Sequence, residues 1–418
     1  MNLRLIEESG VIMFSTIQEV EVFFNERKKF GMKPGLERIH ELLARLGNPE
    51  NHFKAIHIAG TNGKGSTLHF IKAALQANGY EVGIFTSPSF TGLRGHILLN
   101  DQEIPEKIMV EQMNHILPHV REMDEADLAP TEFEVLTALA FCFFAQNGEF
   151  VLIEAGMGGR FDTTNAVQPI LSIITSIARD HMDYLGESES EIAWHKAGII
   201  KETIPVVVGD LDEEAFAVIE EESRKKHAPC FKLGMDFNRM YFNLQMKGEH
   251  QQDNASLALQ ALHILKQSGF KLDFEKAICQ IEDTMLPGRF ECVQHSPVVI
   301  LDAAHNPAGI KAFIQTAHEQ YPDANKQVIV AMFRDKAIAE MLDLLSEQFE
   351  HITLTTFEHP RAWNLNNLPC NIPLEQVNPD YKAVLEYILD NDSVYFITGS
   401  LHFITEVRHY LLNRRKMM

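Results

Sequence analysis

The sequence predicts an α/β protein with a mostly parallel sheet of the P-loop type, followed by a smaller, Rossmann-like α/β domain. Three observations predict this class. Apolar, strand-like runs alternate with helical patterns, the apolar residues within each run are nearly continuous, and the rhythm restarts after residue 297. Alternation favours a parallel sheet, and continuous apolar runs are typical of strands that helices cover on both faces.

The first series of strand-like runs occupies the first half of the chain. Each run has strand length, and helical patterns separate one run from the next. The runs are KAIHIAG (54–60), EVGIFTS (81–87), FVLIEAG (150–156), LSIITSIA (171–178) and IPVVVGD (204–210). They predict the strands of the larger sheet.

A second series begins after PGRFECVQHSP (287–297). Its runs are VVILDAAHN (298–306), QVIVAMF (327–333), HITLTTF (351–357) and SVYFITGS (393–400). The Pro-Gly turn at 287–288 and the restart of the strand and helix rhythm place a boundary near residue 295. The sequence therefore predicts two domains, 1–295 and 296–418.

Two helical segments carry clear patterns. STLHFIKAALQANG (66–79) places Leu68, Ile71 and Ala74 on one face, and Gly79 is expected to end the helix. VLTALAFCFFA (135–145) is apolar throughout but too short to cross a membrane, so it predicts a buried helix.

The composition excludes several classes of protein. The chain has 418 residues, 45% of them hydrophobic, which is enough for two or three domains with their own cores. The 37 Lys and Arg against 58 Asp and Glu give a net charge of −21. This charge disfavours binding to nucleic acid or to an anionic membrane. No segment reaches transmembrane length.

The sequence also bears on location. Its five scattered cysteines form no C-x-x-C pair, as is typical of a reducing compartment. Glu7 and Glu8 interrupt the apolar core that a signal peptide would need. We therefore expect a cytoplasmic protein, and a monomer by default. Because recognisable patterns begin near Ile17, the start could be Met1 or Met13.

The stretch GTNGKGST (60–67) lies between the first predicted strand and the helix that follows it. The common P-loop pattern has a glycine five positions before its Gly-Lys pair, but Ile58 stands five positions before Gly63, and Gly65 follows Lys64. A bound phosphate needs backbone N–H groups, a lysine and a helix N-terminus, and all three remain plausible here. The alternative is an ordinary glycine turn with a solvated lysine.

Ligands of open α/β sheets gather where the strands end at their carboxyl edge. Candidate residues stand at such ends: Lys64, Ser87, Glu154, Asp180, His181, Asp302 and His305. A carboxylate such as Glu154, at the end of a buried strand and facing a phosphate loop, is the arrangement that holds Mg²⁺ on ATP. The alternative is an acidic residue in a solvated loop.

Other candidates have alternatives of their own. His181 could be a metal ligand or a structural histidine. Lys196 could be an ordinary surface lysine. The segment LDAAHNPAG (301–309) could supply functional residues or only cap a helix.

An ordered set of motifs resembles the folylpolyglutamate synthase/dihydrofolate synthase family of the Mur ligase superfamily. The motifs are GTNGKGST, TSPSF, IEAGMGGRFDTTN, TSIARDHMDYLG, HKAGIIK, DNASLALQAL, PGRF, LDAAHNP, EHPRA and TGSL. The match runs from about residue 17 to 410, and the set is specific although no single motif is. The resemblance implies a P-loop-type ATPase domain followed by a glutamate ligase domain.

The resemblance also implies a reaction. An ATP-dependent amide ligase would add L-glutamate to a folate or to dihydropteroate, with ATP and Mg²⁺ as cofactors. The γ-phosphoryl group would pass to the substrate carboxylate, and the amine of glutamate would attack the resulting acyl phosphate.

By the same resemblance, residues of the motifs take roles in binding. The phosphates would lie on Gly60, Thr61, Asn62, Gly63, Lys64, Gly65 and Ser66. Mg²⁺ would bind Ser87, Glu154 and His181. The nucleotide would also contact Asn254, Arg289 and Asp302. His305 would line the same interdomain cleft, and Lys196 matches the position of a carbamylated lysine. The implied catalytic residues are Lys64, Lys196 and His305.

Two places depart from the family pattern. Gly95-His96-Ile97 stands where the family usually has Glu-Arg-Ile, and His195 replaces the usual Glu before the special lysine. These departures leave open a Mur-type ligase for another carboxylate, or a nucleotide-binding relative without catalysis. Lys64 stands too early in the chain for the extra N-terminal domain of the cell-wall ligases, so we expect a folate substrate.

Overall fold

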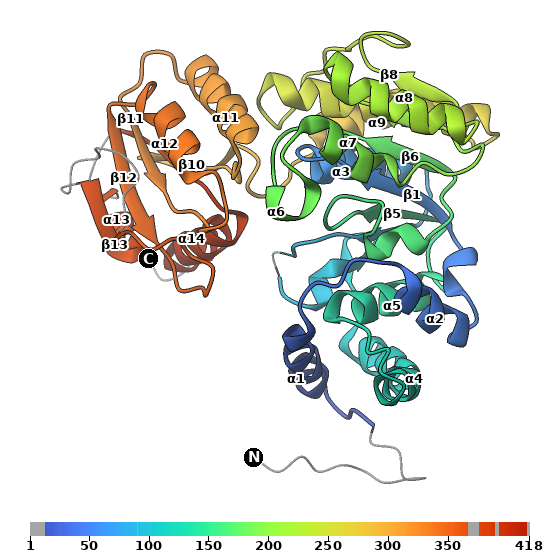
Figure 1. Cartoon of the computed structure of the whole chain (residues 1–418). Coiled ribbons are helices and arrows are strands. Elements are labelled where there is room, and N and C mark those ends of the chain that lie inside the picture. Colours follow the sequence, from blue (N-terminus) through green and yellow to red (C-terminus); the bar gives the residue numbers. More distant parts are fainter. Residues whose placement is uncertain (1–12, 90, 367–375, 389–392, 416–418) are drawn as a thin grey trace. The chain divides into compact units, whose positions relative to one another are not determined.

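The computed structural model describes residues 13–89, 91–366, 376–388 and 393–415 (Figure 1). Met1, Glu7, Glu8, Phe90 and Cys370, which entered the sequence analysis, lie outside the described residues.

Contacts divide the chain into two compact units. Unit 1 contains the chain up to Ile177, Glu189–Arg239 and Ser256–Ile281. Unit 2 contains Ala178–Ser188, Met240–Ala255 and the chain from Glu282. The boundary near residue 295 stays a prediction.

Unit 1 is built on an eight-stranded sheet. Its strands are β1 Lys54–Ala59, β2 Val82–Phe85, β3 Ile97–Leu99, β4 Gln102–Glu103, β5 Phe150–Glu154, β6 Leu171–Ile174, β7 Val206–Val208 and β8 Cys230–Lys232. Their order is β4-β3-β2-β5-β1-β6-β7-β8, and only the β2-β3 and β3-β4 pairs are antiparallel. The central strand β1 has β5 on one side and β6 on the other. Connections leave toward both edges here, which makes the carboxyl ends of these strands the expected ligand position.

Helices lie on both faces of this sheet (Figure 1). They are α1 Ile17–Arg27, α2 Glu37–Arg45, α3 Lys64–Ala77, α4 Glu106–Glu125, α5 Glu132–Phe144, α7 Glu189–Ala197 and α8 Glu213–Lys225, with short 3₁₀ turns η1 Lys28–Phe30, η2 Pro49–Asn51, η3 Arg94–His96 and η4 Thr163–Ala166. Helices α1, α2, α4 and α5 share one apolar core with β2 and β5, and α7 and α8 share another with β6 and β7.

The two helices with clear sequence patterns are confirmed. Helix α3 begins two residues before the predicted start and ends at Ala77, shortly before Gly79 with its positive φ of 86°. Helix α5 is buried along most of its length. The hydroxyl of Thr131 and the carboxylate of Glu134 cap its first turn reciprocally, which satisfies backbone N–H groups that a helix start leaves without acceptors. Within the described residues, no helix is both long and apolar enough to cross a membrane.

Unit 2 is built on a second, six-stranded sheet. Its elements are β9 Glu291–His295, β10 Val298–Leu301, α11 Pro307–Gln320, β11 Lys326–Val330, α12 Ile338–Ser346, β12 His351–Thr356, β13 Val377–Asp380, α13 Tyr381–Ile388, β14 Val394–Thr398 and α14 Leu401–Arg415. The order is β13-β12-β11-β14-β10-β9, and β9 is antiparallel to β10. The short helix α6 Met182–Leu185 belongs to this unit, and the division falls within α9 Glu249–Gln267 and α10 Phe274–Asp283.

The α/β class and both series of parallel strands are thus confirmed. The sequence analysis missed β3, β4, β8, β9 and β13. All but β3 lie at an edge of their sheet, and all five are short or polar, so they lack the long apolar run by which the central strands are found.

Candidate functional site

The loop Gly60–Gly63 connects the end of β1 to the first residue of α3. A Cβ at Gly60 would lie 1.9 Å from Oγ1 of Thr175, so the backbone passes where no other residue fits. Gly63 caps α3 in the left-handed conformation, with φ of 85°. Both glycines are therefore required by the geometry, and α3 directs its N-terminus at the space above the loop.

Residues at the end of β6 hold this loop in place. The N–H of Thr61 donates to the carbonyl of Ser176, and the N–H of Asn62 donates to the Ser176 hydroxyl, both at 2.9 Å. The hydroxyl of Thr175 donates to the carbonyl of Asn62 at 2.6 Å. The loop is thus fixed by its neighbouring strand, and the sequence analysis did not find this role for Thr175 and Ser176.

The side chain of Lys64 lies over the loop and is mostly buried. Its Nζ donates to the carbonyls of Gly60, at 3.0 Å, and Thr61, at 3.3 Å. The same Nζ lies 3.9 Å from Oε1 of Glu154, whose side chain is 9% exposed. The structure therefore does not support a solvated lysine on an ordinary glycine turn, nor a solvated Glu154.

Glu154 is held from its other side by the end of β2. Its Oε2 accepts a short hydrogen bond from the hydroxyl of Thr86. The carbonyl of Thr86 in turn lies 2.7 Å from Nδ1 of His96, and burial lowers the pKa of this imidazole. Ser87 follows directly and is half-buried. His96, which departs from the family pattern, thus contacts the end of β2 next to Ser87. The sequence did not predict the role of Thr86 as a partner of Glu154.

Lys196 lies in α7 and is 3% exposed, so it is not a surface lysine. A close-packed loop faces the end of this helix: a Cβ at Gly159 would lie 3.1 Å from the carbonyl oxygen of Lys196, and one at Gly198 would lie 2.3 Å from Cα of Arg160. Burial lowers the pKa of the adjacent His195, and the charges of Arg160 and Lys196 act in the same direction.

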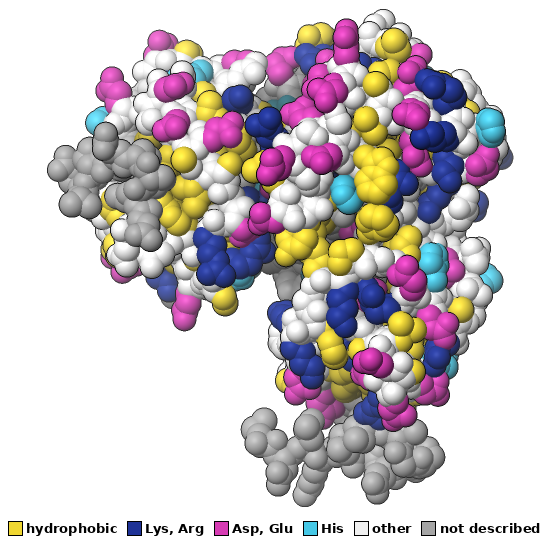
Figure 2. Space-filling model, viewed as in Figure 1, with side chains coloured by type: hydrophobic (Ala, Val, Ile, Leu, Met, Phe, Trp, Pro, Cys, Tyr) yellow, Lys and Arg dark blue, Asp and Glu magenta, His cyan; other side chains and the backbone are white. Residues whose placement is uncertain are grey.

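Two exposed aromatic side chains lie together at α7, Trp194 in the helix and Phe161 in the segment that follows β5. Trp194 and Phe161 are 42% and 43% exposed, and the Arg160 guanidinium lies 4.2 Å from the Trp194 ring centroid. Figure 2 shows hydrophobic side chains gathered over this helix.

Unit 2 contains His181, Asn254, Arg289, Asp302 and His305. Of these, Asp302 connects two backbone segments. Its carboxylate accepts hydrogen bonds from the N–H of Phe290, at 3.0 Å, and from the N–H of Ala304, at 2.9 Å. Burial raises the pKa of Asp302, while the charge of Arg289 opposes this shift.

A buried polar group surrounds Asn254. Its Nδ2 donates to Oε1 of Gln251 at 3.0 Å, and Nε2 of Gln251 lies 3.2 Å from the ring of His250. Burial and the charge of Arg289 lower the pKa of His250 to about 4. The predicted nucleotide residue Asn254 is thus linked to His250 through Gln251, and the sequence did not single out His250.

His305 and Asn306 lie in the turn between β10 and α11. Asn306 caps α11 by accepting the N–H of Gly309 at 2.8 Å. The His305 ring has Nδ1 2.8 Å from the carbonyl of Ala303 and Nε2 3.4 Å from Oδ2 of Asp180. Both partners only accept, so the ring donates to both only when both nitrogens carry a proton. The alternative that this segment only caps a helix is therefore correct for Asn306. It does not account for His305, whose ring lies next to the carboxylate of Asp180.

That carboxylate, Asp180, is 7% exposed on its side chain and pairs with Lys336. Burial alone would raise the pKa of Asp180, but the hydrogen bond with His305 and the charge of Lys336 hold it well below its usual range. Lys336 follows β11, and the sequence analysis missed it although it stands after a predicted strand.

Within the described residues, no three His, Cys, Asp or Glu side chains lie together as a metal site would require. The predicted ligands Ser87 and Glu154 belong to unit 1 and His181 belongs to unit 2.

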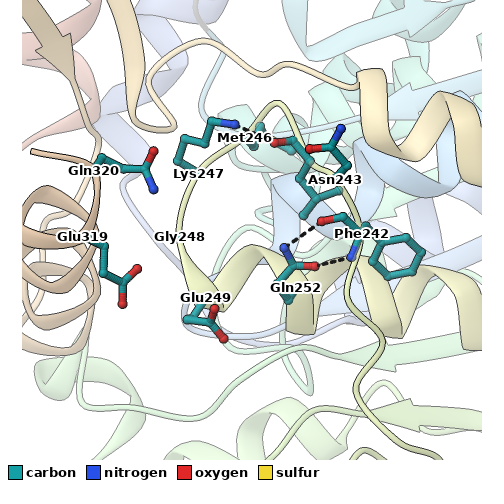
Figure 3. A pocket seen from close by; sticks show the side chains of 10 residues that line it. Phe242, Asn243, Met246, Lys247, Gly248, Glu249, Gln252, Glu319 and Gln320 are labelled. Carbon is teal, nitrogen blue, oxygen red and sulfur yellow. Dashed lines mark hydrogen bonds between the residues drawn. The ribbon is translucent and has the colours of Figure 1, made fainter.

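A separate pocket of about 200 Å³ lies in unit 2 (Figure 3). Residues 242–244, 246–249 and Gln252 form one side, and Glu319 and Gln320 of α11 form the other. Gln252 fixes the first side by hydrogen bonds to the N–H and carbonyl of Phe242. No predicted site residue lines this pocket.

Comparisons with known proteins identify the family of this chain. Residues 58–274 match the Mur ligase middle domain, and residues 288–401 match the Mur ligase glutamate ligase domain. A dihydrofolate synthase/folylpolyglutamate synthase of Bacillus subtilis (strain 168) is 36% identical, covering 96% of this chain and 100% of that protein.

Solved structures are similar over nearly the whole chain. Folylpolyglutamate synthase from Thermotoga maritima has a TM-score of 0.80 at 32% identity and covers 95% of this chain and 96% of its own. Mycobacterium tuberculosis folylpolyglutamate synthase, complexed with ADP and AMPPCP, has a TM-score of 0.84 at 28% identity, over 94% of this chain and 98% of its own. The chain therefore belongs to the folylpolyglutamate synthase/dihydrofolate synthase family of Mur ligases.

Proposed function

We propose that this protein is an ATP-dependent ligase that joins L-glutamate to the carboxylate of a folate, of dihydropteroate, or of both. One observation carries the proposal. The glycine loop between β1 and α3 is fixed, with Lys64 beside Glu154, in a chain that matches relatives named for this reaction along nearly its full length.

ATP fits the loop. Gly60 has no Cβ to clash with Thr175, so the loop lies close against the end of β6, and Gly63 in the left-handed conformation begins α3. Such an arrangement, with a lysine beside it, suits a phosphate. The Mycobacterium relative in complex with ADP and AMPPCP supports the same assignment. Asn254, Arg289 and Asp302 would contact the rest of the nucleotide.

The ligand types also suit Mg²⁺. Glu154 and Ser87 offer the carboxylate and hydroxyl oxygens that this ion prefers, and His181 would complete the set. When bound, Mg²⁺ would offset negative charge on the phosphates. Thr86 and Lys64, which contact the Glu154 carboxylate, hold it in place.

The reaction has two steps. A carboxylate oxygen of the folate attacks the γ-phosphorus and ADP leaves; the amine of glutamate then attacks the acyl carbon, phosphate leaves, and the amine loses a proton. Lys64 would hold charge on the transferred group, and His305 would act in the same site.

Lys196 would act as a carbamate. Its neutral amine attacks CO₂, a nitrogen–carbon bond forms, and a proton is lost. The product carries a negative charge and two oxygen donors, so it could help to hold a cation that an ammonium would repel. Burial of Lys196 supports this proposal, since it disfavours the charged amine.

One assay tests the proposed function. The purified protein is given Mg²⁺-ATP, L-glutamate and either dihydropteroate or a reduced folate, and ADP release is measured together with the mass of the product. We expect glutamate-dependent ADP release with at least one substrate. Release that does not depend on glutamate, or no release with either substrate, would contradict the proposal.

The remaining sequence predictions belong to the same proposal. A ligase for these small molecules would act in the cytoplasm as a monomer, without nucleic acid or membrane as a partner. The four cysteines within the described residues are free thiols, which suits a reducing compartment.

A further inference from the structure

The buried ion pair between Asp180 and Lys336 joins a residue of the motif TSIARDHMDYLG to a lysine that lies outside the family motifs. Nζ of Lys336 is 2.6 Å from Oδ1 of Asp180, and the two side chains are only 6% and 7% exposed. Two buried charges lose their hydration, so such a pair adds little net stability on its own. We therefore ask which neighbouring side chains the Asp180–Lys336 pair holds in position.

Asp180 collects donors from three separate segments of unit 2. Oδ1 accepts from Lys336, which follows β11, and from the backbone N–H of His181 at 2.8 Å. Oδ2 accepts from Nδ2 of Asn306 at 3.2 Å and lies 3.4 Å from Nε2 of His305. One carboxylate thus connects the segment 178–188 to the turn before α11 and to the turn after β11.

The backbone of His181 depends on this carboxylate. His181 has φ of 52° and ψ of 39°, the left-handed conformation, which is uncommon for a residue other than glycine. Its N–H is held by the preceding side chain, and α6 starts directly after it. Lys336 orients the carboxylate of Asp180, and this carboxylate holds the backbone of His181. The pair therefore also fixes the position from which the His181 side chain extends.

Lys336 pairs with Asp180 and not with Asp335, the acidic residue next to it in the sequence. Asp335 pairs instead with Arg361, at 2.7 Å, and that pair is much more exposed, at 31% and 49%. The chain thus separates a solvated ion pair from a buried one at adjacent positions. Only the buried one contacts residues predicted to serve the reaction.

We propose that Lys336 and Asp180 are positioning residues, which hold His181 and His305 in the arrangement that the ligase reaction requires. This inference rests on the proposed function, because His181 is a predicted Mg²⁺ ligand there. In this proposal Lys336 acts by orienting Asp180, and it does not contact the substrate.

The test uses the full chain and the variants Lys336→Met, Lys336→Arg and Asp180→Asn/Lys336→Met. Binding of Mn²⁺, as a probe for Mg²⁺, is measured by electron paramagnetic resonance in the presence of ADP, with no folate or glutamate. We expect Lys336→Met to weaken Mn²⁺ binding by at least about tenfold, as loss of a supporting residue does at other metal sites. Lys336→Arg should restore part of this binding.

The double variant separates positioning from folding. Lys336→Met leaves a buried carboxylate without its cation, which can prevent folding; the double variant removes both charges and keeps a hydrogen-bonding amide at position 180. We expect it to fold and still to bind Mn²⁺ weakly. Wild-type Mn²⁺ binding in the folded double variant, or no Mn²⁺ binding by the wild-type protein with ADP, would overturn the inference.

A matched control is Lys225→Met, which removes an exposed ion pair with Glu221 and should leave Mn²⁺ binding unchanged. The Mg²⁺ dependence of kcat gives a second readout: Lys336→Met should raise the Mg²⁺ concentration for half-maximal rate more than the KM for ATP. If the wild-type protein ligates glutamate to neither substrate, the proposed function fails, and Mn²⁺ binding still decides the positioning role.

Discussion

Nζ of Lys64 lies 3.9 Å from Oε1 of Glu154, across the carboxyl ends of two adjacent parallel strands. The lysine begins α3 after β1, and the glutamate ends β5. Each is held separately, the ammonium by carbonyls of the glycine loop and the carboxylate by Thr86. A cation and an anion are thus placed side by side where a phosphate and a metal ion would have to meet.

Lys64→Ala should abolish turnover and leave the fold intact. The ammonium acts by its charge on a transferred phosphoryl group, and loss of one such contact costs about 10² to 10³ in kcat. The measurement is ADP release, with thermal unfolding as the check on folding. Near-wild-type turnover in a folded variant would refute the phosphate-loop assignment.

Glu154→Gln should raise the Mg²⁺ concentration needed for half-maximal rate by at least about tenfold while changing ATP affinity less, because it removes the charge and keeps the shape. Mg²⁺ titrations of the rate, at saturating ATP, measure this. Ser87→Ala should act in the same direction and more weakly, as a neutral ligand contributes less. Unchanged titration curves for Glu154→Gln would count against its role as a ligand.

Much of this site could be predicted because it follows strands with long apolar runs. The runs KAIHIAG (54–60) and FVLIEAG (150–156) identify β1 and β5, and the parallel sheet brings their ends together. The pairing of Asp180 with Lys336 could not be found in this way. The two residues stand 156 positions apart, and no local pattern states which of many charged residues will meet.

His96 illustrates a different limit. Its place in the sequence marks only a departure from the family pattern, and its contact with the carbonyl of Thr86 becomes visible only when β3 pairs with β2. Strand β3 has only three residues and lies between β2 and the edge strand β4, so its register was not predictable from the sequence.

Gly60→Ala should disrupt the loop by a steric clash. The new Cβ would lie 1.9 Å from Oγ1 of Thr175, far inside any allowed contact. Relief requires the strand end and the loop to separate, at a cost of about 1–3 kcal/mol. Urea unfolding measures the free energy of unfolding, and titration measures the affinity for ADP. Both the free energy of unfolding and the affinity should fall.

Gly79→Ala is the matched control for this clash. Gly79 also has a positive φ, of 86°, but a Cβ there would meet nothing within 4 Å. It should therefore lose stability through backbone strain alone and keep ADP affinity. Equal ADP affinities of the two variants would mean that the close approach at Gly60 is unimportant.

Acid should destabilise unit 1 through His57, which is fully buried in β1 beside Thr164. Burial, with the charge of Lys201, lowers the pKa of His57 from 6.5 to about 3. The unfolded chain therefore binds a proton below pH 6.5 that the folded chain does not, so stability falls as the pH drops from about 6.5 to about 3. The loss from this group should reach about 3 kcal/mol near pH 4.

Urea unfolding as a function of pH measures this loss. The variant His57→Gln keeps a hydrogen-bonding group beside Thr164 but cannot take up a proton, so its stability should fall less steeply over the same pH range. Parallel pH profiles for the two proteins would show that His57 is not the group responsible.

Lys196→Ala should cripple the enzyme, whereas His195→Ala should not. Both residues stand at the end of α7, but Lys196 is 3% exposed and His195 is only half-buried. An ammonium in the proposed site would repel Mg²⁺, and a carbamate at the same position reverses the sign of the charge. The rates of ADP release by the two variants compare these residues directly.

The carbamate itself can be observed with ¹³C-labelled bicarbonate. A second buried lysine provides the control: burial lowers the pKa of Lys201 to about 8, so its amine is also neutral often enough to capture CO₂. Lys201 donates to the carbonyl of Asn165 at 2.8 Å, which holds it in another contact. We therefore expect a carbamate signal in the Mg²⁺-ATP-bound wild-type protein and in Lys201→Arg, and none in Lys196→Arg. A signal that disappears in Lys201→Arg and persists in Lys196→Arg would place the modification at Lys201, and the absence of any signal from an active wild-type protein would rule the carbamate out.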